Sequence, residues 1–169
     1  CNKQRQSVNK MAGNNVTRFL VANKVEFELY ELPKEKLGAE KTAELLQVPI
    51  WIVYKTIVVK RTHSGKPILA IIPGDRSVDL KLLAQAINEK KLLLPTEEAA
   101  EELTGLQAGG ISPLALINRG FQIVLDETAL KLKAIHISAG ERGLNLKISP
   151  LSLIALTKAR IAPISLVKV

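Results

Sequence analysis

The sequence predicts a single α+β domain built around a mixed, mostly antiparallel sheet with flanking helices. Its 169 residues, 47% hydrophobic and 24% charged, have the length and composition of one ordinary globular domain. Helical and strand patterns occur in mixed order, and strands often follow one another directly, which argues against a doubly wound parallel sheet. Residues 15–160 contain no internal repeat or linker. We therefore expect one domain over residues 15–169, preceded by a mobile tail over residues 1–14.

Five helices are expected from capping residues and apolar periodicity. Asn15 is expected to cap the first, because apolar residues follow it at helical spacing. In the second, over residues 39–47, we expect Ala43, Leu45 and Leu46 to face inward. The remaining helices are expected at residues 79–88, 97–104 and 150–159; Asp75, Asp79 and Thr96 are read as capping residues, and Ser149-Pro150 opens the last helix.

Strands are expected where polar and apolar residues alternate or where β-branched residues dominate. The clearest run is residues 50–59, rich in Ile and Val. Residues 134–138 and 144–148 flank Gly140-Glu141-Arg142-Gly143, a sequence typical of a hairpin turn. The other strands are expected at residues 25–30, 68–72, 92–94 and 122–126.

The positive charge of the chain is concentrated at its two ends. The net charge is +8. Residues 1–25 carry five cations and no acid, and residues 128–169 carry seven cations and the single acid Glu141. Such a distribution suits a polyanionic partner such as a nucleic acid. A solvated basic surface without a partner explains the composition equally well.

The sequence points away from secreted and membrane-embedded proteins. Cys1 is the only cysteine, so no intrachain disulfide can form and a disulfide-stapled fold is excluded. No apolar run is long enough to span a bilayer, and no signal-peptide pattern is present. We expect a cytoplasmic protein with no membrane partner.

Lys55 is the most unusual residue of the chain. It is the only charged residue in the run from Ile50 to Val59, and strand alternation places it on the same face as apolar neighbours. An ammonium group there must reach solvent, pair with an anion or accept a lowered pKa. Lys55 is therefore either an edge-strand lysine that discourages aggregation or a group that meets a phosphate or carbonyl oxygen in a cleft.

A glycine-rich loop, Gly109-Gly110-Ile111-Ser112-Pro113, offers backbone N–H groups with little side chain in the way. Such loops can hold an anion or the oxygen of a carbonyl under attack. A tight turn between a helix and a strand explains the same residues. The glycine spacing matches neither the dinucleotide fingerprint nor the P-loop.

The predicted hairpin places Ser138 at a strand end and Arg142 at the turn. Arg142 either contacts a phosphate or is a solvated turn residue. The two histidines, His63 and His136, have no nearby cysteine or carboxylate cluster, so we expect no metal site. His136 alternates with isoleucines, and we expect it on the exposed face of its strand. No nucleophile-elbow motif supports a catalytic triad.

Four segments in this order resemble the YbaK/EbsC family of tRNA-editing domains, over roughly residues 15–160. They are Tyr54-Lys55-Thr56-Ile57, Pro73-Gly74-Asp75-Arg76 with the helix that follows, Thr104-Gly105 with the loop from Gly109 to Leu114, and Ser138-Ala139-Gly140-Glu141-Arg142-Gly143-Leu144. The family's tyrosine just after the first strand would fall near Leu32, whereas the nearest tyrosine here is Tyr30.

The resemblance implies a barrel-like mixed sheet and hydrolysis of the ester that joins an amino acid to tRNA, most specifically cysteine on tRNA(Pro). It implies no metal, no cofactor and no protein nucleophile, because the substrate's own thiol attacks the carbonyl. Prolyl-tRNA synthetase is the implied partner besides the aminoacyl-tRNA. The implied catalytic residues are Lys55 and Gly109, and the implied substrate-binding residues are Thr56, Gly110, Ile111, Ser112, Pro113, Ser138, Gly140 and Arg142.

Two other functions fit the same resemblance. A sister subgroup removes alanine from tRNA(Pro) without a substrate thiol and discriminates by the size of its pocket. A non-catalytic module that binds tRNA or a synthetase would keep the fold without turnover, and its function would not depend on Lys55.

Overall fold

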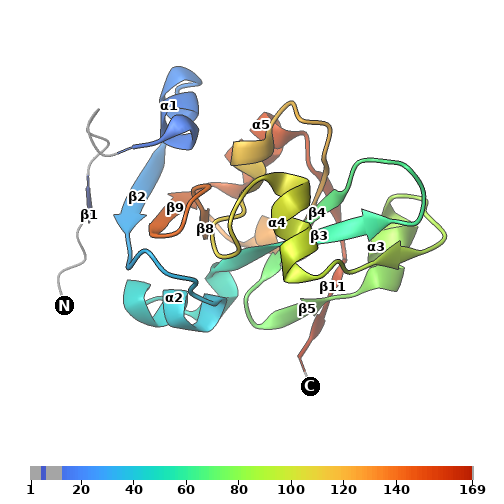
Figure 1. Ribbon diagram of the computed structural model, residues 1–169. Coiled ribbons are helices and arrows are strands. Elements are labelled where there is room, and N and C mark those ends of the chain that lie inside the picture. Colours follow the sequence, from blue (N-terminus) through green and yellow to red (C-terminus); the bar gives the residue numbers. More distant parts are fainter. Residues whose placement is uncertain (1–4, 7–12, 169) are drawn as a thin grey trace.

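The structure is a computed structural model that describes residues 5–6 and 13–168, and it confirms the predicted α+β class (Figure 1). The mobile tail predicted for residues 1–14 falls mostly outside the described part. Within that segment, Arg5–Gln6 form the short strand β1, and Asn14 caps the first helix. None of the described helices has the length and hydropathy needed to cross a membrane.

The strands form two main sheets and one two-stranded ladder. The first sheet has the order β1-β2-β9-β8 and is antiparallel throughout; beyond β1, its strands are β2 (Phe27–Glu31), β9 (Leu144–Ile148) and β8 (Ile135–Ser138). The second has the order β10-β7-β4-β3-β6; its strands are β10 (Arg160–Ala162), β7 (Gln122–Asp126), β4 (Ile68–Pro73), β3 (Tyr54–Arg61) and β6 (Leu92–Leu93). The ladder pairs β11 (Ser165–Val167) with β5 (Arg76–Val78).

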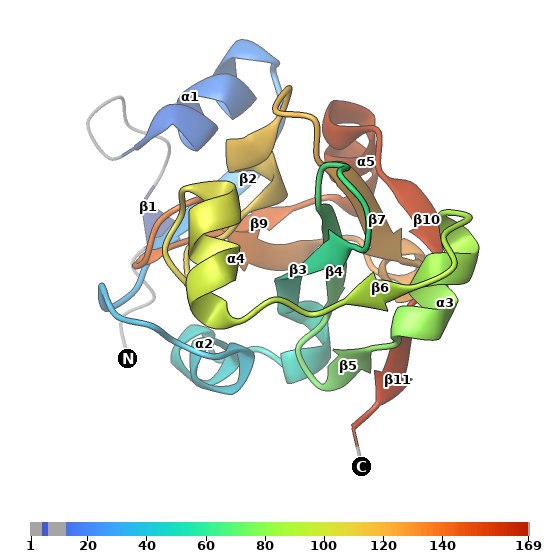
Figure 2. The ribbon, with the colours of Figure 1, turned by 45° about the vertical axis from the view of Figure 1, so that its right-hand side comes forward.

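The pairing within the second sheet is mixed, as predicted. β7 runs parallel to both β4 and β10, while β3 is antiparallel to β4 and β6. The two main sheets meet at an isolated parallel bridge between Val53 and His136, just before β3 begins. Figure 2 shows β3 and β4 of the second sheet beside β9 of the first, in a barrel-like arrangement.

The second sheet is covered on both faces, so the core has two parts. On β4, all six residues are buried. Leu69 and Ile71 belong to the larger cluster, shared with β8, β9 and the first helix, while Ile68 and Ile72 belong to a smaller cluster against the third helix. This strand therefore reads as a continuous apolar run, as strands buried on both faces do.

The five predicted α-helices are present. Their bounds are α1 (Asn15–Ala22), α2 (Ala39–Leu46), α3 (Leu80–Ala86), α4 (Glu97–Thr104) and α5 (Pro150–Thr157). Thr96 and Asp79 are confirmed as N-caps, since their side chains accept hydrogen bonds from Ala99 N and Leu82 N. Asp75 is not a cap; it lies in the turn between β4 and β5.

Two details of the helix predictions were wrong. The first helix is capped by Asn14, because its side chain accepts a hydrogen bond of 3.1 Å from Thr17 N while the Thr17 hydroxyl accepts one from Asn14 N. Asn15 is instead the first helical residue. In α2, Leu45 is 38% exposed and Thr42 is buried in its place, because the buried stripe of this short helix runs through residues 42, 43 and 46.

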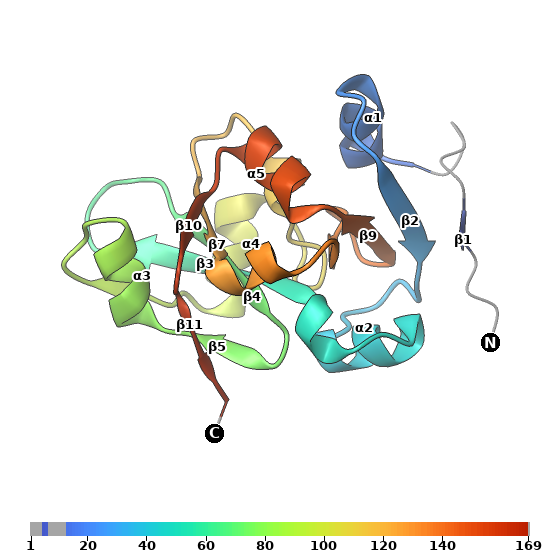
Figure 3. The same ribbon diagram turned by 180° about the vertical axis from the view of Figure 1, so that it is seen from behind.

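Three strand predictions also need correction. Residues 50–52 form a 3₁₀ turn, in which Val53 N donates to Ile50 O, and β3 begins only at Tyr54. His136 is 2% exposed, because its ring packs against Tyr30 of β2 and is hydrogen-bonded to Asn145 of β9. The short strands β5, β10 and β11 were not predicted; Figure 3 shows the chain passing from α5 through β10 into β11, beside β5.

Candidate active site

A cavity of about 460 Å³ opens where the two main sheets diverge. Beyond the Val53–His136 bridge, β3 has no strand partner on this side among the described residues until Lys60 pairs with Leu93 of β6. The free edge of β3 forms one wall, and the end of β8 with the start of β9 forms another. The loop before α2, the N-terminal part of α4 and the glycine loop close the remaining sides. This volume is in the range of ligand-binding sites.

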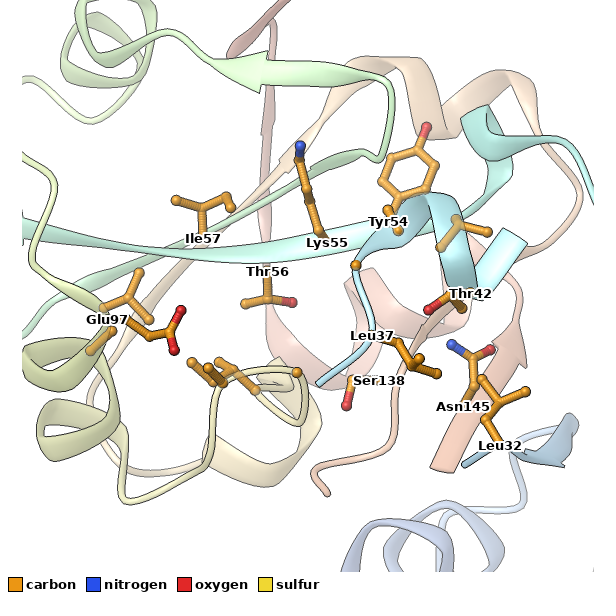
Figure 4. Close-up of a pocket in the computed structure, with 18 of the residues that line it drawn as sticks. Leu32, Leu37, Thr42, Tyr54, Lys55, Thr56, Ile57, Glu97, Ser138 and Asn145 are labelled. Atoms are coloured by element: carbon orange, nitrogen blue, oxygen red, sulfur yellow. The ribbon is translucent and has the colours of Figure 1, made fainter. Parts of the chain in front are cut away.

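Lys55 and Thr56 of β3 reach the cavity from opposite faces of the strand. Figure 4 shows the Lys55 side chain on one side of β3, together with Ile57, and Thr56 on the other side, toward Ser138. The alternation predicted for this run is thus present: Val59, on the Lys55 face, is fully buried in the smaller core cluster. Lys55 and Ile57 are the residues of β3 through which that face reaches the cavity.

The Lys55 ammonium group is half-buried and weakly held. Its Nζ lies 3.4 Å from the carbonyl oxygen of Gly74. The pKa of Lys55 is lowered to about 8, chiefly because burial removes hydration from the ammonium group and, to a smaller extent, because the ammonium group of Lys168 lies nearby. The carboxylates of Asp75 and Glu40 act in the opposite direction. Lys55 is therefore a cation that an incoming anion would stabilise.

Ser138 and Asn145 are cross-strand partners on β8 and β9, and both line the cavity. Asn145 is 5% exposed, and its Oδ1 lies 2.9 Å from Nδ1 of the buried His136. When His136 Nδ1 carries the proton, it donates to Asn145, and the amide NH₂ of Asn145 remains for a group in the cavity. The sequence did not predict either role, because a polar residue in an alternating strand is normally expected to face solvent.

The glycine loop supplies backbone to one wall of the cavity. Gly109 lines the cavity with φ of +88°, a conformation that favours glycine. Its N–H donates to no acceptor among the described residues, whereas the Gly110 N–H donates to Gln107 O at 2.8 Å. Of these two amides, Gly109 therefore has the free donor.

Five of the predicted site residues line the cavity: Lys55, Thr56, Gly109, Ile111 and Ser138. The other five lie behind the lining: Gly110, Ser112, Pro113, Gly140 and Arg142. Arg142 Nε donates to Ala108 O at 2.7 Å, which ties the hairpin turn to the glycine loop. A Cβ on Gly110 would lie 2.9 Å from backbone atoms of that turn, so the two segments approach as closely as glycine allows.

These supporting residues also anchor the loop to the core. Ser112 is fully buried, and its Oγ accepts a hydrogen bond from Leu114 N at the start of the 3₁₀ turn Pro113–Leu116. Gly140 packs against Ala115. These contacts hold the glycine loop, and with it Gly109, against the hairpin turn and the core. Direct contact of the five supporting residues with a substrate stays a prediction.

The remaining wall comes from segments that sequence reasoning did not single out. Leu32, near the position of the family tyrosine, lines the cavity, while Tyr30 is buried edge-on against the ring of His136. The apolar lining also includes Leu37 and Leu94. No local motif marks these residues, because they come together only through the fold.

The described lining of the cavity holds few charged side chains. Its charged lining residues, within the described chain, are Lys55, Glu35 and Glu97, and Glu97 is paired with Lys36. The described lining contains no His, Cys or Asp. Burial raises the pKa of Tyr54 to about 12, and its hydroxyl is hydrogen-bonded to Thr128. No group of three potential metal ligands occurs anywhere in the described residues.

Comparison with known proteins connects this geometry to one family. The family model for the aminoacyl-tRNA editing domain matches residues 34–156. An Enterococcus faecalis protein named as a Cys-tRNA(Pro)/Cys-tRNA(Cys) deacylase, EbsC, is 34% identical over 153 residues, which cover 89% of this chain and 92% of EbsC. A proline–tRNA ligase of Chlamydia pneumoniae is 33% identical over 91 residues, which cover 53% of this chain but 16% of the ligase.

Solved structures show the same fold. The crystal structure of the hypothetical protein APE2540 superimposes with a TM-score of 0.83 at 25% identity, covering 90% of this chain and 100% of that one. A crystal structure described as a trans-editing enzyme for prolyl-tRNA synthetase gives a TM-score of 0.72 at 25% identity, covering 83% and 87% of the two chains. The family and fold predictions from the sequence are therefore confirmed.

Proposed function

This chain belongs to the aminoacyl-tRNA editing domain family and is an aminoacyl-tRNA deacylase, and we propose that it removes cysteine from Cys-tRNA(Pro) in trans. The observation that carries the proposal is the composition of the cavity. It offers a lysine, hydroxyl groups and a free backbone amide, but no nucleophile paired with a general base among its described lining residues. Such a site suits a substrate that brings its own nucleophile.

The proposed reaction begins with the thiol of the bound cysteinyl group. Its sulfur attacks the ester carbonyl carbon, a C–S bond forms, and the bond from that carbon to the ribose oxygen breaks. The thiol proton ends on the ribose oxygen, so the products are tRNA with a free hydroxyl and a cyclic thioester of cysteine. Water then opens the thioester to free cysteine.

The protein's share of this reaction is positioning and electrostatic stabilisation. The Gly109 N–H is a free donor on the glycine-loop wall, and we assign it to the developing oxyanion of the ester. Thr56 and Ser138 would orient the ester from the two facing walls. Holding the thiol close to its own carbonyl can supply several kcal/mol of barrier lowering without acid–base groups.

Lys55 would bind the tRNA end rather than the reacting atoms. Its ammonium group points away from Thr56 and lies near the Gly74 carbonyl. A phosphate of the acceptor end at that position would offset the unfavourable burial of the charge. The ester would then lie between Thr56 and the glycine loop, on the other side of β3.

We further propose prolyl-tRNA synthetase as a docking partner and the cytoplasm as the site of action. The matching stretch in the Chlamydia pneumoniae ligase is a small part of a much longer synthetase. A separate editing domain would gain from meeting mischarged tRNA as the synthetase releases it. Adding the synthetase to the deacylation reaction should then raise kcat/KM without changing which amino acid is removed.

The test is hydrolysis of Cys-tRNA(Pro), Ala-tRNA(Pro) and Pro-tRNA(Pro) by the wild-type protein. We expect the cysteinyl ester to be cleaved fastest and the prolyl ester to be spared. Preference for the alanyl ester would assign the chain to the alanine-specific subgroup. Binding without turnover of all three esters, with and without the synthetase, would leave a non-catalytic binding module and refute the proposal.

A further inference from the structure

A second lysine, Lys168, lies beside Lys55, and we propose that the two form a paired-cation site for one phosphate of the single-stranded acceptor end of tRNA. This inference rests on the proposed function, because it names the part of the substrate that Lys55 meets. It adds a positioning residue that follows the C-terminal strand β11, outside the four segments that resemble the editing family and outside the cavity lining.

The position of Lys168 follows from the β11–β5 ladder. In this antiparallel pair, Val167 lies opposite Arg76. Lys168 is the residue that follows β11, so it leaves the ladder on the side of Gly74 and Asp75. Lys55 Nζ contacts the Gly74 carbonyl oxygen at 3.4 Å. The register therefore brings both lysines to the same turn.

The strand that precedes Lys168 is firmly anchored. Arg76 holds Ser165 through two hydrogen bonds, Nε to the hydroxyl at 2.7 Å and a terminal nitrogen to the carbonyl at 2.9 Å. Just before the strand, Ile164 N donates to the buried carboxylate of Asp126 at 2.9 Å. These contacts fix the start of β11, and the ladder fixes the rest.

The charges at this turn leave room for an anion. The Lys168 ammonium group is close enough to Lys55 to lower its pKa, while Asp75 and Glu40 partly offset this effect. Neither lysine forms an ion pair with a side-chain carboxylate among the described residues. Asp75 Oδ1 is buried and has no hydrogen-bond partner in the described part of the chain. Two neighbouring cations repel each other. A phosphate between them would form one attractive contact with each ammonium group and so offset that repulsion.

The paired lysines would separate the place where the phosphate binds from the place where the ester reacts. Lys55 lines the cavity along β3, but its ammonium group lies at the edge toward β5. A phosphate bound by Lys55 and Lys168 would lie at that edge, with the terminal ribose and its ester reaching across β3 toward Thr56. Lys168 would therefore affect binding of the tRNA end and leave the chemical step unchanged.

The test measures binding of an RNA microhelix that has a single-stranded CCA end and carries no amino acid, so that it needs no catalysis. Lys168→Met keeps the aliphatic chain and removes the charge; Lys90→Met is the matched control, since Lys90 is exposed and lies in the loop between α3 and β6. We expect Lys168→Met to weaken binding about 5- to 10-fold at low salt and to reduce the salt-dependence slope by about one contact. Lys168→Arg should retain the affinity, and Lys90→Met should behave as the wild type.

A second measurement distinguishes a positioning role from a structural one. The pH midpoint of binding should move above 8 in Lys168→Met, because removing that cation raises the pKa of Lys55. Wild-type affinity, salt slope and pH midpoint in Lys168→Met would overturn the inference. If the protein hydrolyses no aminoacyl-tRNA yet microhelix binding depends on Lys168, the proposed function fails while the phosphate site stands. If deacylation is normal but microhelix binding does not depend on Lys168, the phosphate site fails while the proposed function stands.

Discussion

Replacing Lys55 by methionine should remove activity and at the same time stabilise the fold at neutral pH. Methionine keeps the aliphatic packing of the side chain and removes the half-buried charge. A pKa of about 8 in place of the ordinary 10.5 corresponds to roughly 3 kcal/mol against the charged form. Solvent around a half-buried side chain screens part of this, so we expect a gain of about 1–2 kcal/mol in the free energy of unfolding at pH 7.

The sign of the pH dependence follows from proton binding. Below pH 8 the lysine is charged in both the folded and the unfolded state, and the folded state bears the full cost of burying the charge. Between pH 8 and 10.5 the folded protein has released the proton while the unfolded chain still binds it, so wild-type stability rises relative to the variant. Above 10.5 the cost has disappeared.

Urea unfolding at pH 7 and pH 9.5 measures this effect, with Lys55→Arg as the control. Arginine remains charged at both pH values. The free energy of unfolding of the control should therefore not exceed that of the wild type at pH 7 and should be lower than that of the wild type at pH 9.5. A methionine variant that is less stable than wild type at pH 7 would refute the reasoning. So would a stability difference between wild type and the variant that does not change with pH.

Three further substitutions test other parts of the site and the fold. Gly110→Ala should lower kcat/KM at least about 10-fold and cost about 1–3 kcal/mol of stability, because its Cβ would lie 2.9 Å from backbone atoms of the hairpin turn; deacylation kinetics and thermal unfolding measure the two effects. Asp126→Ala should cost about 2–4 kcal/mol in urea unfolding, because Ile164 N and the Thr128 hydroxyl lose a buried acceptor; a loss below 0.5 kcal/mol would contradict it. Asn145→Leu should raise KM or lower kcat for the cysteinyl substrate while circular dichroism stays unchanged, because the cavity loses a hydrogen-bonding amide; wild-type kinetics would exclude a role for this amide.

The sequence was most informative where a residue conflicted with its surroundings. A single lysine in a β-branched run indicated an unusual environment, and Lys55 does lie half-buried at the edge of a cavity. Capping chemistry located α3 and α4 closely, since Asp79 and Thr96 act through local hydrogen bonds. Local physics of this kind is readable without tertiary contacts.

The parts that were missed depend on tertiary structure. His136 Nδ1 and Asn145 Oδ1 are hydrogen-bonded inside the protein, and two residues that look solvent-facing along their strands are both buried. β10 and β11 are three residues long each, too short for periodicity to identify, and they form because β7 and β5 offer free edges. The cavity itself is assembled from segments between residues 32 and 145, and no sequence motif specifies their meeting.

The most direct test of the central claim is single-turnover cleavage of Cys-tRNA(Pro) beside Ser-tRNA(Pro), with wild-type protein in excess. The two esters differ in one atom of the side chain, a sulfur in place of an oxygen, so binding should be similar. If the substrate's thiol is the nucleophile, the cysteinyl ester should be cleaved at least about 100-fold faster. Equal rates for the two esters would show that water attacks directly and would contradict the proposed mechanism.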